Sequence, residues 1–332
     1  MSDAIGVSKV DSARGATLVD TDKADPLRLT PQATPSRRGR RGESNRLQLG
    51  MLLFALPALA FYTFVVLVPS VRGAVYSFTD WSGQGSDFDF VGLQQYIRVF
   101  ADPASFGALW HTVALAIGIT IAQTGIGLLL ALGVHSGIRS GGHLRVVFFA
   151  PAVVAPIASS YLWQYMFAPN GPLNAVLSAV GLPKLDWLGD PSVVLSSIAI
   201  VMVWQFSGYS MVIFLAGLEG VPPEQIEAAM LDGAGAARRF WYVVRPLLAP
   251  AFIVNLMISL IGGLKLFDQV YAATNGGPGY ASETLSTVLY KQAFVFGNYG
   301  YSTAIALVLA LFVAAVSLVQ VHLLRGREVT IS

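Results

Sequence analysis

The sequence predicts an all-α membrane protein with six transmembrane helices. Two observations lead to this prediction: an unusually apolar composition, and six apolar stretches that are each long enough to cross a bilayer. Of the 332 residues, 54% are hydrophobic and only 12% are charged, whereas soluble domains carry about 25% charged residues. The chain also has no Cys, which excludes disulfides, thiolate catalysis and zinc–thiolate sites.

Each transmembrane helix requires about 20 predominantly apolar residues. Six stretches satisfy this length, namely residues 48–69, 108–134, 146–168, 192–218, 247–270 and 302–324. Prolines within some of them are compatible with a membrane helix, because neighbouring helices can satisfy the backbone groups that proline leaves free. We therefore expect residues 47–325 to form one six-helix transmembrane domain.

The distribution of basic residues predicts the orientation of this domain, since cytoplasmic loops are enriched in Lys and Arg. Most of the basic residues lie in the N-terminal tail, in loop 135–145, between the fourth and fifth predicted spans, and at the C-terminus. The opposite loops contain only Arg72, Arg98, Lys184 and Lys291, and Lys265 alone falls within a predicted span. We therefore expect both termini in the cytoplasm.

The two ends of the chain differ in composition from the apolar domain. Residues 1–46 are polar, contain several prolines and end in an Arg-rich cluster, so they are predicted to form a disordered, basic cytoplasmic tail. The cluster either binds anionic lipid of the membrane or only determines topology. Residues 326–332 are predicted to be a second, short cytoplasmic tail.

Residues 221–246 form a polar insert between the fourth and fifth predicted spans, here called the 221–246 segment. Pro222 and Pro223 are suited to the start of a helix, and Gly233 is suited to its end. A second short helix is expected from about Ala236 up to Pro246. The segment contains no nucleophile, metal site or phosphate loop, so it is predicted to be a docking element. The alternative is a generic helical hairpin in the cytoplasm.

This segment resembles the EAA loop of the permease subunits of bacterial ABC importers. The family pattern is EAA, two residues, DGA, then a Phe, a β-branched residue and Leu-Pro. The matching residues are Glu227, Ala228, Ala229, Asp232, Gly233, Ala234, Phe240, Val243 and Pro246. Arg245 occupies the position where the family has Leu, which is the one departure within the motif.

The resemblance extends over residues 50–325 and is closest to the carbohydrate uptake class, which includes the maltose and glycerol-phosphate permeases. Phe90–Tyr96 resembles an "FVGL-N-Y" segment of that class, and Asn275–Pro278 resembles its "GGP" loop. The resemblance implies a type I importer fold in the bacterial inner membrane. It also implies three partners: a second homologous permease subunit, a cytoplasmic ATPase dimer that docks on the EAA loop, and an extracytoplasmic solute-binding protein.

The chain is not expected to be an enzyme. It has no G-x-x-x-x-G-K-[ST] phosphate loop, so an ATP-driven importer would need its ATPase on another polypeptide. The four His residues show no metal-ligand spacing, and we expect neither a cofactor nor a nucleic-acid partner.

The fourth predicted span carries polar and aromatic residues suited to a sugar. Aromatic faces cover the C–H surfaces of sugars, and neutral polar groups satisfy their hydroxyls. Gln205 and Tyr209, together with Ser259 of the fifth span, are the predicted contacts. In the permeases that this chain resembles, the pocket is built from these two spans. For any one of the three, packing between helices is the alternative role.

The fifth predicted span carries a recurring polar pattern. Ser259, Lys265 and Asp268 are spaced so that they would share one face of a continuous helix. A lysine at mid-membrane costs roughly 2.5–3.5 kcal/mol, so it is expected to face protein or water and to have a partner. The pair Lys265 and Asp268 is therefore predicted to be either part of a substrate pathway or gate, or a structural ion pair.

Two other classes of function are alternatives to the permease hypothesis. A stand-alone secondary transporter would have inverted repeats or several membrane carboxylates, and no clear repeat is present. A polytopic membrane enzyme would need catalytic acids, a histidine site or a metal cluster. The substrate stays open between an oligosaccharide, a monosaccharide and a glycerophosphodiester or other solute.

Overall fold

The computed structural model describes residues 54–137 and 140–325. Within these residues the secondary structure is helical, apart from an isolated antiparallel β-bridge between Thr79 and Phe90. Of the described residues, 62–137 and 140–325 belong to one compact unit, and the packing described below lies inside it. The predicted tails, residues 1–46 and 326–332, lie outside the described residues.

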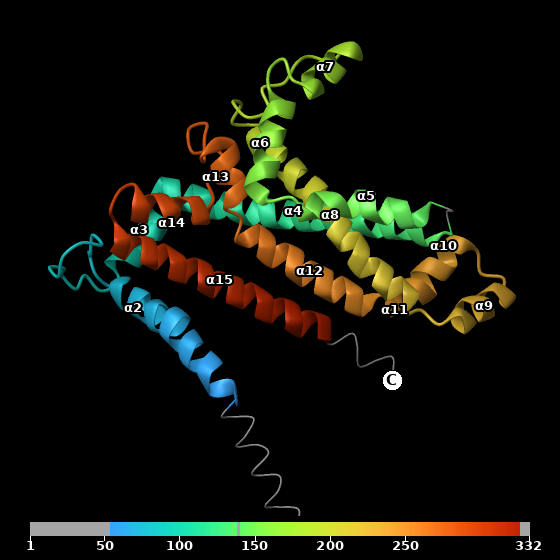
Figure 1. Cartoon of the computed structure of the whole chain (residues 1–332), viewed down its shortest axis with the longest axis horizontal. Coiled ribbons are helices and arrows are strands. Elements are labelled where there is room, and N and C mark those ends of the chain that lie inside the picture. The colour runs from blue at the N-terminus through green and yellow to red at the C-terminus, as the bar shows by residue number, and fades with distance from the viewer. Residues whose placement is uncertain (1–53, 138–139, 326–332) are drawn as a thin grey trace, which may run out of the picture. The chain divides into compact units, whose positions relative to one another are not determined.

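Residues 54–62 are α-helical and lead into the first of the labelled segments (Figure 1). In chain order they are η1 (Thr63–Leu67), α2 (Val68–Tyr76), α3 (Gln94–Ala101), α4 (Pro103–His135), α5 (Gly141–Val153), α6 (Pro156–Phe167), α7 (Pro172–Ala179), α8 (Val194–Glu219), α9 (Pro223–Leu231), α10 (Ala236–Arg239), η2 (Phe240–Val244), α11 (Arg245–Leu247), α12 (Ala249–Leu264), α13 (Asp268–Thr274), α14 (Leu285–Phe294) and α15 (Tyr299–Arg325).

Four of the predicted spans are continuous helices long and apolar enough to cross a membrane. They are Phe54–Tyr76, Pro103–His135, Val194–Glu219 and Tyr299–His322. The third and fifth predicted spans are each broken into two helices, bent by 99° between α5 and α6 and by 69° at the start of α12. The described residues therefore contain four such helices, or up to six if each bent pair is one span.

The break in the third span follows from its prolines. Pro156 has no N–H to continue a helical ladder, and a residue that precedes proline is pushed toward extended backbone. Val154 and Ala155 have ψ angles of 135°, so α5 ends at Val153 and α6 begins in a new direction at Pro156. The prediction of one continuous helix over 146–168 is wrong for this reason.

The helix of the fifth span ends earlier than the predicted range of residues 247–270. Helix α12 ends at Leu264, directly after the pair Gly262 and Gly263, and α13 begins at Asp268. Glycine weakens a helix interior by about 1 kcal/mol relative to alanine, so two in succession favour this end. Residues 265–267 are a non-helical connection, which changes the geometry of the polar pattern predicted for this span.

Each π-helical segment lies directly before a proline. Segment η1 ends two residues before Pro69, and η2 ends two residues before Pro246. A proline ring clashes with the carbonyl group four residues earlier, and the wider π turn gives that carbonyl room. The first span therefore continues through Pro69 to Tyr76. Arg72 lies within α2 and not in the loop for which it was predicted.

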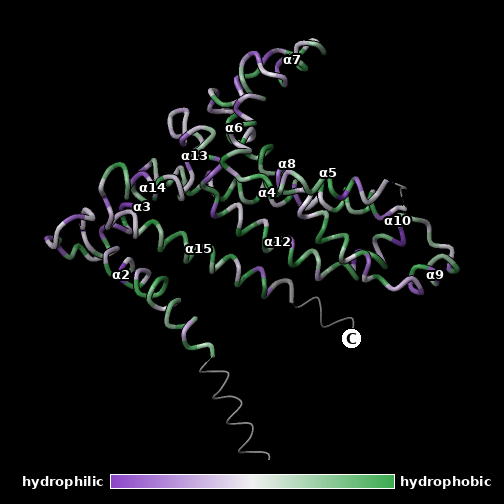
Figure 2. Tube along the Cα trace, viewed as in Figure 1, coloured by the Kyte–Doolittle hydropathy of each residue, from purple (hydrophilic) through white to green (hydrophobic). Residues whose placement is uncertain are grey.

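Helices α4, α8 and α12 pack side by side and carry much of the buried core (Figure 1). Their backbones come close where a glycine faces a neighbour. A Cβ atom at Gly208 of α8 would overlap the carbonyl oxygen of Phe148 in α5, and one at Gly263 of α12 would lie 2.7 Å from the Cα of Ala116 in α4. Small residues at such crossings are typical of membrane helix packing. The lengths of α4, α12 and α15 are largely hydrophobic (Figure 2).

Candidate functional site

The 221–246 segment forms two short helices, as the sequence predicts. Helix α9 contains Glu227, Ala228 and Ala229, and Asp232 is its C-cap. Gly233 follows with a φ angle of +75°, a left-handed conformation that glycine adopts without steric cost. Glycine is therefore required at this position by the backbone itself, because a side chain there would strain the turn.

The outer surface of α9 is uncovered. Glu227, Ala228, Asp232 and Gly233 are exposed, and the apolar side chain of Leu231 is 89% exposed. Met230 beside it is 53% exposed, and adjacent exposed apolar side chains are a feature of interaction surfaces. The structure thus presents the predicted docking residues together on one accessible element, while Pro246 lies further on, in α11.

Three features lie around the base of the 221–246 segment. Ile226 borders a cavity of about 180 Å³ together with Leu218 of α8 and Val244 of η2. The Arg145 guanidinium forms an ion pair of 3.1 Å with Glu219 at the end of α8. Arg245, the departure from the family motif, places its guanidinium 5.1 Å from the ring centroid of Trp241, which is within the range of a cation–π contact.

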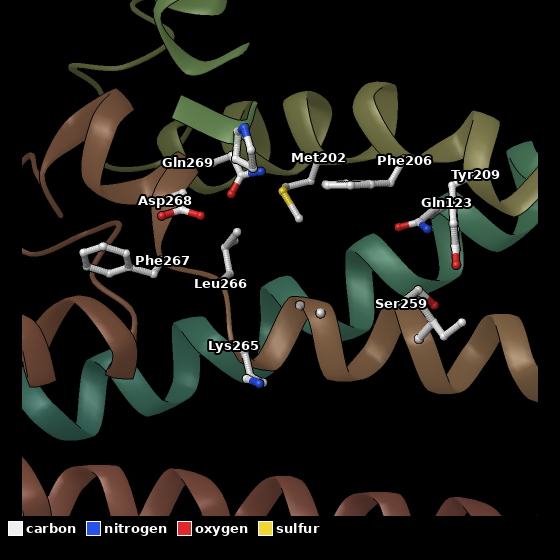
Figure 3. A pocket seen from close by; sticks show the side chains of 14 residues that line it. Gln123, Met202, Phe206, Tyr209, Ser259, Lys265, Leu266, Phe267, Asp268 and Gln269 are labelled. Atoms are coloured by element: carbon white, nitrogen blue, oxygen red, sulfur yellow. The ribbon is translucent and has the colours of Figure 1, made fainter. Parts of the chain in front are cut away.

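A cavity of about 320 Å³ lies between α8 and α12, and we call it the α8–α12 cavity. Four of the five residues predicted for a substrate pathway line it: Tyr209, Ser259, Lys265 and Asp268. Tyr209 and Ser259 lie at one end, and Asp268 lies at the other end with Phe267 and Gln269 (Figure 3). The volume falls within the usual range for small-molecule sites.

Lys265 and Asp268 do not share a helix face, contrary to the prediction. Lys265 is the C-cap of α12 and Asp268 opens α13, and the Lys265 side chain is directed away from Asp268 (Figure 3). The ion pairs within residues 54–137 and 140–325 involve neither residue. The prediction of a structural ion pair between Lys265 and Asp268 is therefore wrong, because the helix that would align the two side chains ends at Leu264. A role in a pathway stays a prediction.

Gln205 lies beneath the α8–α12 cavity rather than on its wall. Its side chain is fully buried, and its Nε2 donates to the carbonyl oxygen of Val154 at 2.8 Å. Its Oε1 accepts from Ser159 Oγ at 2.9 Å and from Gln269 Nε2 at 3.3 Å. Gln205 therefore joins α8 to the break between α5 and α6 and to α13, instead of offering its amide to a ligand.

Four polar or aromatic residues of the cavity were not among the predicted contacts. They are Gln123 of α4, Phe206 of α8, Phe267 of the 265–267 connection and Gln269 of α13. Gln123 is buried and its Nε2 donates to Ser210 Oγ at 2.9 Å. An amide in the middle of an apolar span was a signal that could have identified Gln123, since polar groups inside a membrane domain face protein or a cavity.

The described residues contain no group of three or more His, Asp or Glu residues arranged to hold a metal ion. The walls of the α8–α12 cavity combine aromatic and aliphatic side chains with two hydroxyl groups, two amides, one ammonium group and one carboxylate. Such a lining can bind and orient a polar organic solute. The residues that line this cavity do not include a nucleophile paired with a general base.

Comparison with known proteins identifies the class to which this architecture belongs. Residues 123–329 match the family described as "Binding-protein-dependent transport system inner membrane component". The probable ABC transporter permease protein YurN of Bacillus subtilis is 36% identical over 83% of this chain and 96% of its own length. The lactose transport system permease protein LacF of Rhizobium radiobacter is 33% identical over 83% of this chain and 94% of its own length.

A further relative is the multiple sugar-binding transport system permease protein MsmF of Streptococcus mutans, which is 34% identical over 79% of this chain and 90% of its own length. Among solved structures, a chain of a bacterial ABC transporter involved in alginate import has a TM-score of 0.75. That match covers 86% of this chain and 99% of the other, at 18% identity, and it establishes the fold.

These matches define an integral membrane permease of the ABC importer type. The chain belongs to the family of binding-protein-dependent transport system inner membrane components, as the resemblance in the sequence predicts. Its fold is that of an ABC importer permease, and its place is the inner membrane.

The position of Gln205 generates a prediction about stability. Gln205→Leu keeps the size of the side chain but leaves the Val154 carbonyl and the Ser159 hydroxyl without their partner. We expect it to lower the free energy of unfolding by about 2 kcal/mol, measured as a lower Tm of the detergent-solubilised protein. Gln94→Leu, the same change at an exposed position of α3, is the control. Equal melting of the two variants would contradict the role assigned to Gln205.

Proposed function

We propose that this chain is one of two homologous permease subunits that form the translocation pathway of a sugar importer. A separate cytoplasmic ATPase dimer drives transport, and an extracytoplasmic solute-binding protein delivers the sugar. The observation that carries this proposal is the α8–α12 cavity, which lies between the two helices that lead into and out of the 221–246 segment. A solute in the cavity and a partner on the segment would thus act on the same two helices.

The choice of a sugar is supported by the cavity and by the relatives. The rings of Phe206 and Tyr209 can cover the C–H faces of a sugar. The Ser259 hydroxyl can donate to or accept from sugar hydroxyls, and the Asp268 carboxylate can accept from them. MsmF and LacF are named for transport of multiple sugars and of lactose. A second structure of the alginate transporter contains a periplasmic protein bound to an alginate pentasaccharide, which supports a binding protein as a partner.

ATP hydrolysis is assigned to a partner because the chain has no phosphate-binding loop. The 221–246 segment is the proposed contact with the ATPase, through Glu227, Ala228, Ala229, Asp232 and the exposed tip of α9. We also propose a domain that spans residues 47–325, flanked by the two tails, with lipid covering the apolar outer faces of its helices.

Both termini are proposed to lie in the cytoplasm, on the same side as the 221–246 segment. The charge distribution supports this orientation. Six crossings then require that each bent helix pair passes through the membrane as one span.

Transport itself is tested by reconstitution. The importer, assembled with its second permease, ATPase and binding protein, should accumulate one or more neutral sugars from a panel that includes lactose and xylose. Tyr209→Ala should raise the KM for uptake about fivefold, because a ring contact of about 1 kcal/mol is lost. Tyr209→Phe keeps the ring and is the control. If Tyr209→Ala instead lowers complex yield and uptake in equal proportion, with the same preference among sugars, Tyr209 packs and does not bind.

Docking of the ATPase is tested at the tip of α9. Leu231→Glu replaces an exposed apolar contact by a charge without disturbing the core, so the permease should insert normally. Co-purification of the ATPase subunit should fall at least about tenfold, as expected for a central interface residue. Leu182→Glu, the same change at another exposed leucine, should have no such effect. Retention of the ATPase by Leu231→Glu would exclude this surface from the interface.

Orientation is tested with a reporter enzyme that is active only outside the cytoplasm. Fusions after Gly85 and after Gly279 should be active, since both loops lie on the side with few basic residues. Fusions after Gly142 and after Gly235 should be inactive. The reverse pattern at either pair of sites would overturn the proposed orientation.

A further inference from the structure

A second cavity, of about 470 Å³, lies where α3, the start of α4, α13 and α14 meet. We call it the α13–α14 cavity. Its wall includes the aromatic rings of Tyr271, Tyr280 and Phe296 and the side-chain amides of Asn275 and Gln292. Its volume, like that of the α8–α12 cavity, falls within the range of small-molecule sites. The proposed function does not involve the α13–α14 cavity.

The charged groups of this cavity are already compensated. Glu283 is 3% exposed and forms an ion pair with the Lys291 ammonium, which also donates to the carbonyl oxygen of Asn275 at 2.8 Å. Asp102 caps α4 by accepting from the backbone N–H and the hydroxyl of Ser105.

The fourth charged group, the Arg98 guanidinium, lies 4.2 Å from the ring centroid of Tyr301. Two acids and two bases leave the wall without net charge. A wall of this kind favours a neutral polar ligand over an anion, since an anion would need an excess of basic groups.

Tyr280, on this wall, has a strained backbone conformation. Its φ angle is +68°, a conformation that is a genuine outlier for a bulky residue, and its side chain is 64% exposed. Packing of the ring therefore does not explain why a tyrosine occupies a position that glycine would adopt without strain. Strained backbone of this kind persists mainly at functional sites.

A stacked pair of rings connects the two cavities. Phe267 lines the α8–α12 cavity and Tyr271 lines the α13–α14 cavity. Their ring centroids are 5.2 Å apart with planes inclined by 18°. Tyr290 lies 5.0 Å from Tyr271 in an edge-to-face arrangement. The interaction with the Tyr290 hydroxyl raises the pKa of the Tyr271 phenol.

Aromatic rings at the end of a membrane protein commonly form a belt that faces lipid headgroups. The rings of Tyr271 and Tyr280 differ from such a belt, because they share a concave wall with amides and paired charges. Ring faces beside hydrogen-bonding side chains were also the basis for assigning a sugar to the α8–α12 cavity.

We propose that the α13–α14 cavity is a second carbohydrate subsite, which binds a neutral sugar ring before it passes over the Phe267–Tyr271 pair into the α8–α12 cavity. This proposal rests on the proposed function of sugar import. It assigns to the 275–284 loop a direct contact with the solute, and it makes Tyr280 a determinant of sugar capture.

The absence of Cys from the chain allows a direct test by protection of a single introduced thiol. Gln292→Cys places a thiol on the wall of the α13–α14 cavity, and Ile258→Cys places one on the wall of the α8–α12 cavity. Leu182→Cys, at an exposed position that lines neither cavity, is the control. The assembled importer in lipid nanodiscs, without its binding protein, is treated with a maleimide, and modification of this chain is followed over time.

Lactose and xylose are the probes, together with any other sugar that the reconstituted importer transports. At a sugar concentration of twice the Kd, the modification rate of Gln292→Cys should fall about threefold, because only a third of the sites stay empty. Leu182→Cys should react at an unchanged rate. Addition of Tyr280→Gly, which removes the ring and relieves the backbone, should raise the Kd for this protection about fivefold. At the same sugar concentration the modification rate should then fall only about 1.4-fold, whereas Tyr280→Phe should preserve the threefold protection.

The outcomes separate this proposal from the proposed function. Protection of Ile258→Cys without protection of Gln292→Cys would overturn the second subsite and leave sugar import standing. Lack of protection at both positions by every transported sugar would overturn the second subsite as well as the assignment of the α8–α12 cavity. Protection of Gln292→Cys by the sugar-free binding protein alone would make the α13–α14 cavity a protein contact instead.

Discussion

The main constraint on this fold is that backbone groups freed by a helix break must find partners within the protein. The hydrogen bond from Gln205 to the carbonyl oxygen of Val154 meets this requirement at the break in the third span. In a bilayer, a backbone group that leaves a helical ladder finds no water and must be satisfied within the protein. The chain breaks its third span beside Val154, and Gln205, fully buried in α8, supplies the donor at that point. The same amide accepts from Gln269 of α13. One side chain thus fixes the bend in the third span and the position of the helix that closes the α8–α12 cavity.

Helices α8 and α12 connect this cavity to the 221–246 segment. Helix α8 ends at Glu219, and α12 begins at Ala249, directly after the segment. The two helices meet closely at this level, where a Cβ atom at Gly217 would come within 2.9 Å of Leu248 and Ala251. Close-packed helices move as units because their contacts do not deform continuously. A displacement of α9 by a partner would therefore reach the cavity wall through α8 and α12 together.

The sequence was sufficient to predict the apolar helices and the glycine at which the docking helix ends. Val194–Glu219 and Tyr299–His322 agree with the predicted spans within a few residues, and Gly233 ends the docking helix as expected. Helix periodicity could not reveal the end of α12 at Leu264. A prediction that assumes one continuous helix therefore places Lys265 beside Asp268. Gln205 was predicted as a ligand contact, because the sequence does not indicate which carbonyl groups a bent span leaves unpaired.

The two π-helical segments have a consequence for insertions and deletions in the gene. A π turn is an α-helix that has accommodated one additional residue. Loss of one residue within Thr63–Leu67 or Phe240–Val244 converts that segment to α-helix and preserves the faces of the flanking helix, so its cost is limited to the clash with the following proline. The same loss in the middle of α4 or α8 would rotate every later side chain of the helix by about 100°. Single-codon deletions between homologous permeases should therefore collect just ahead of these two prolines.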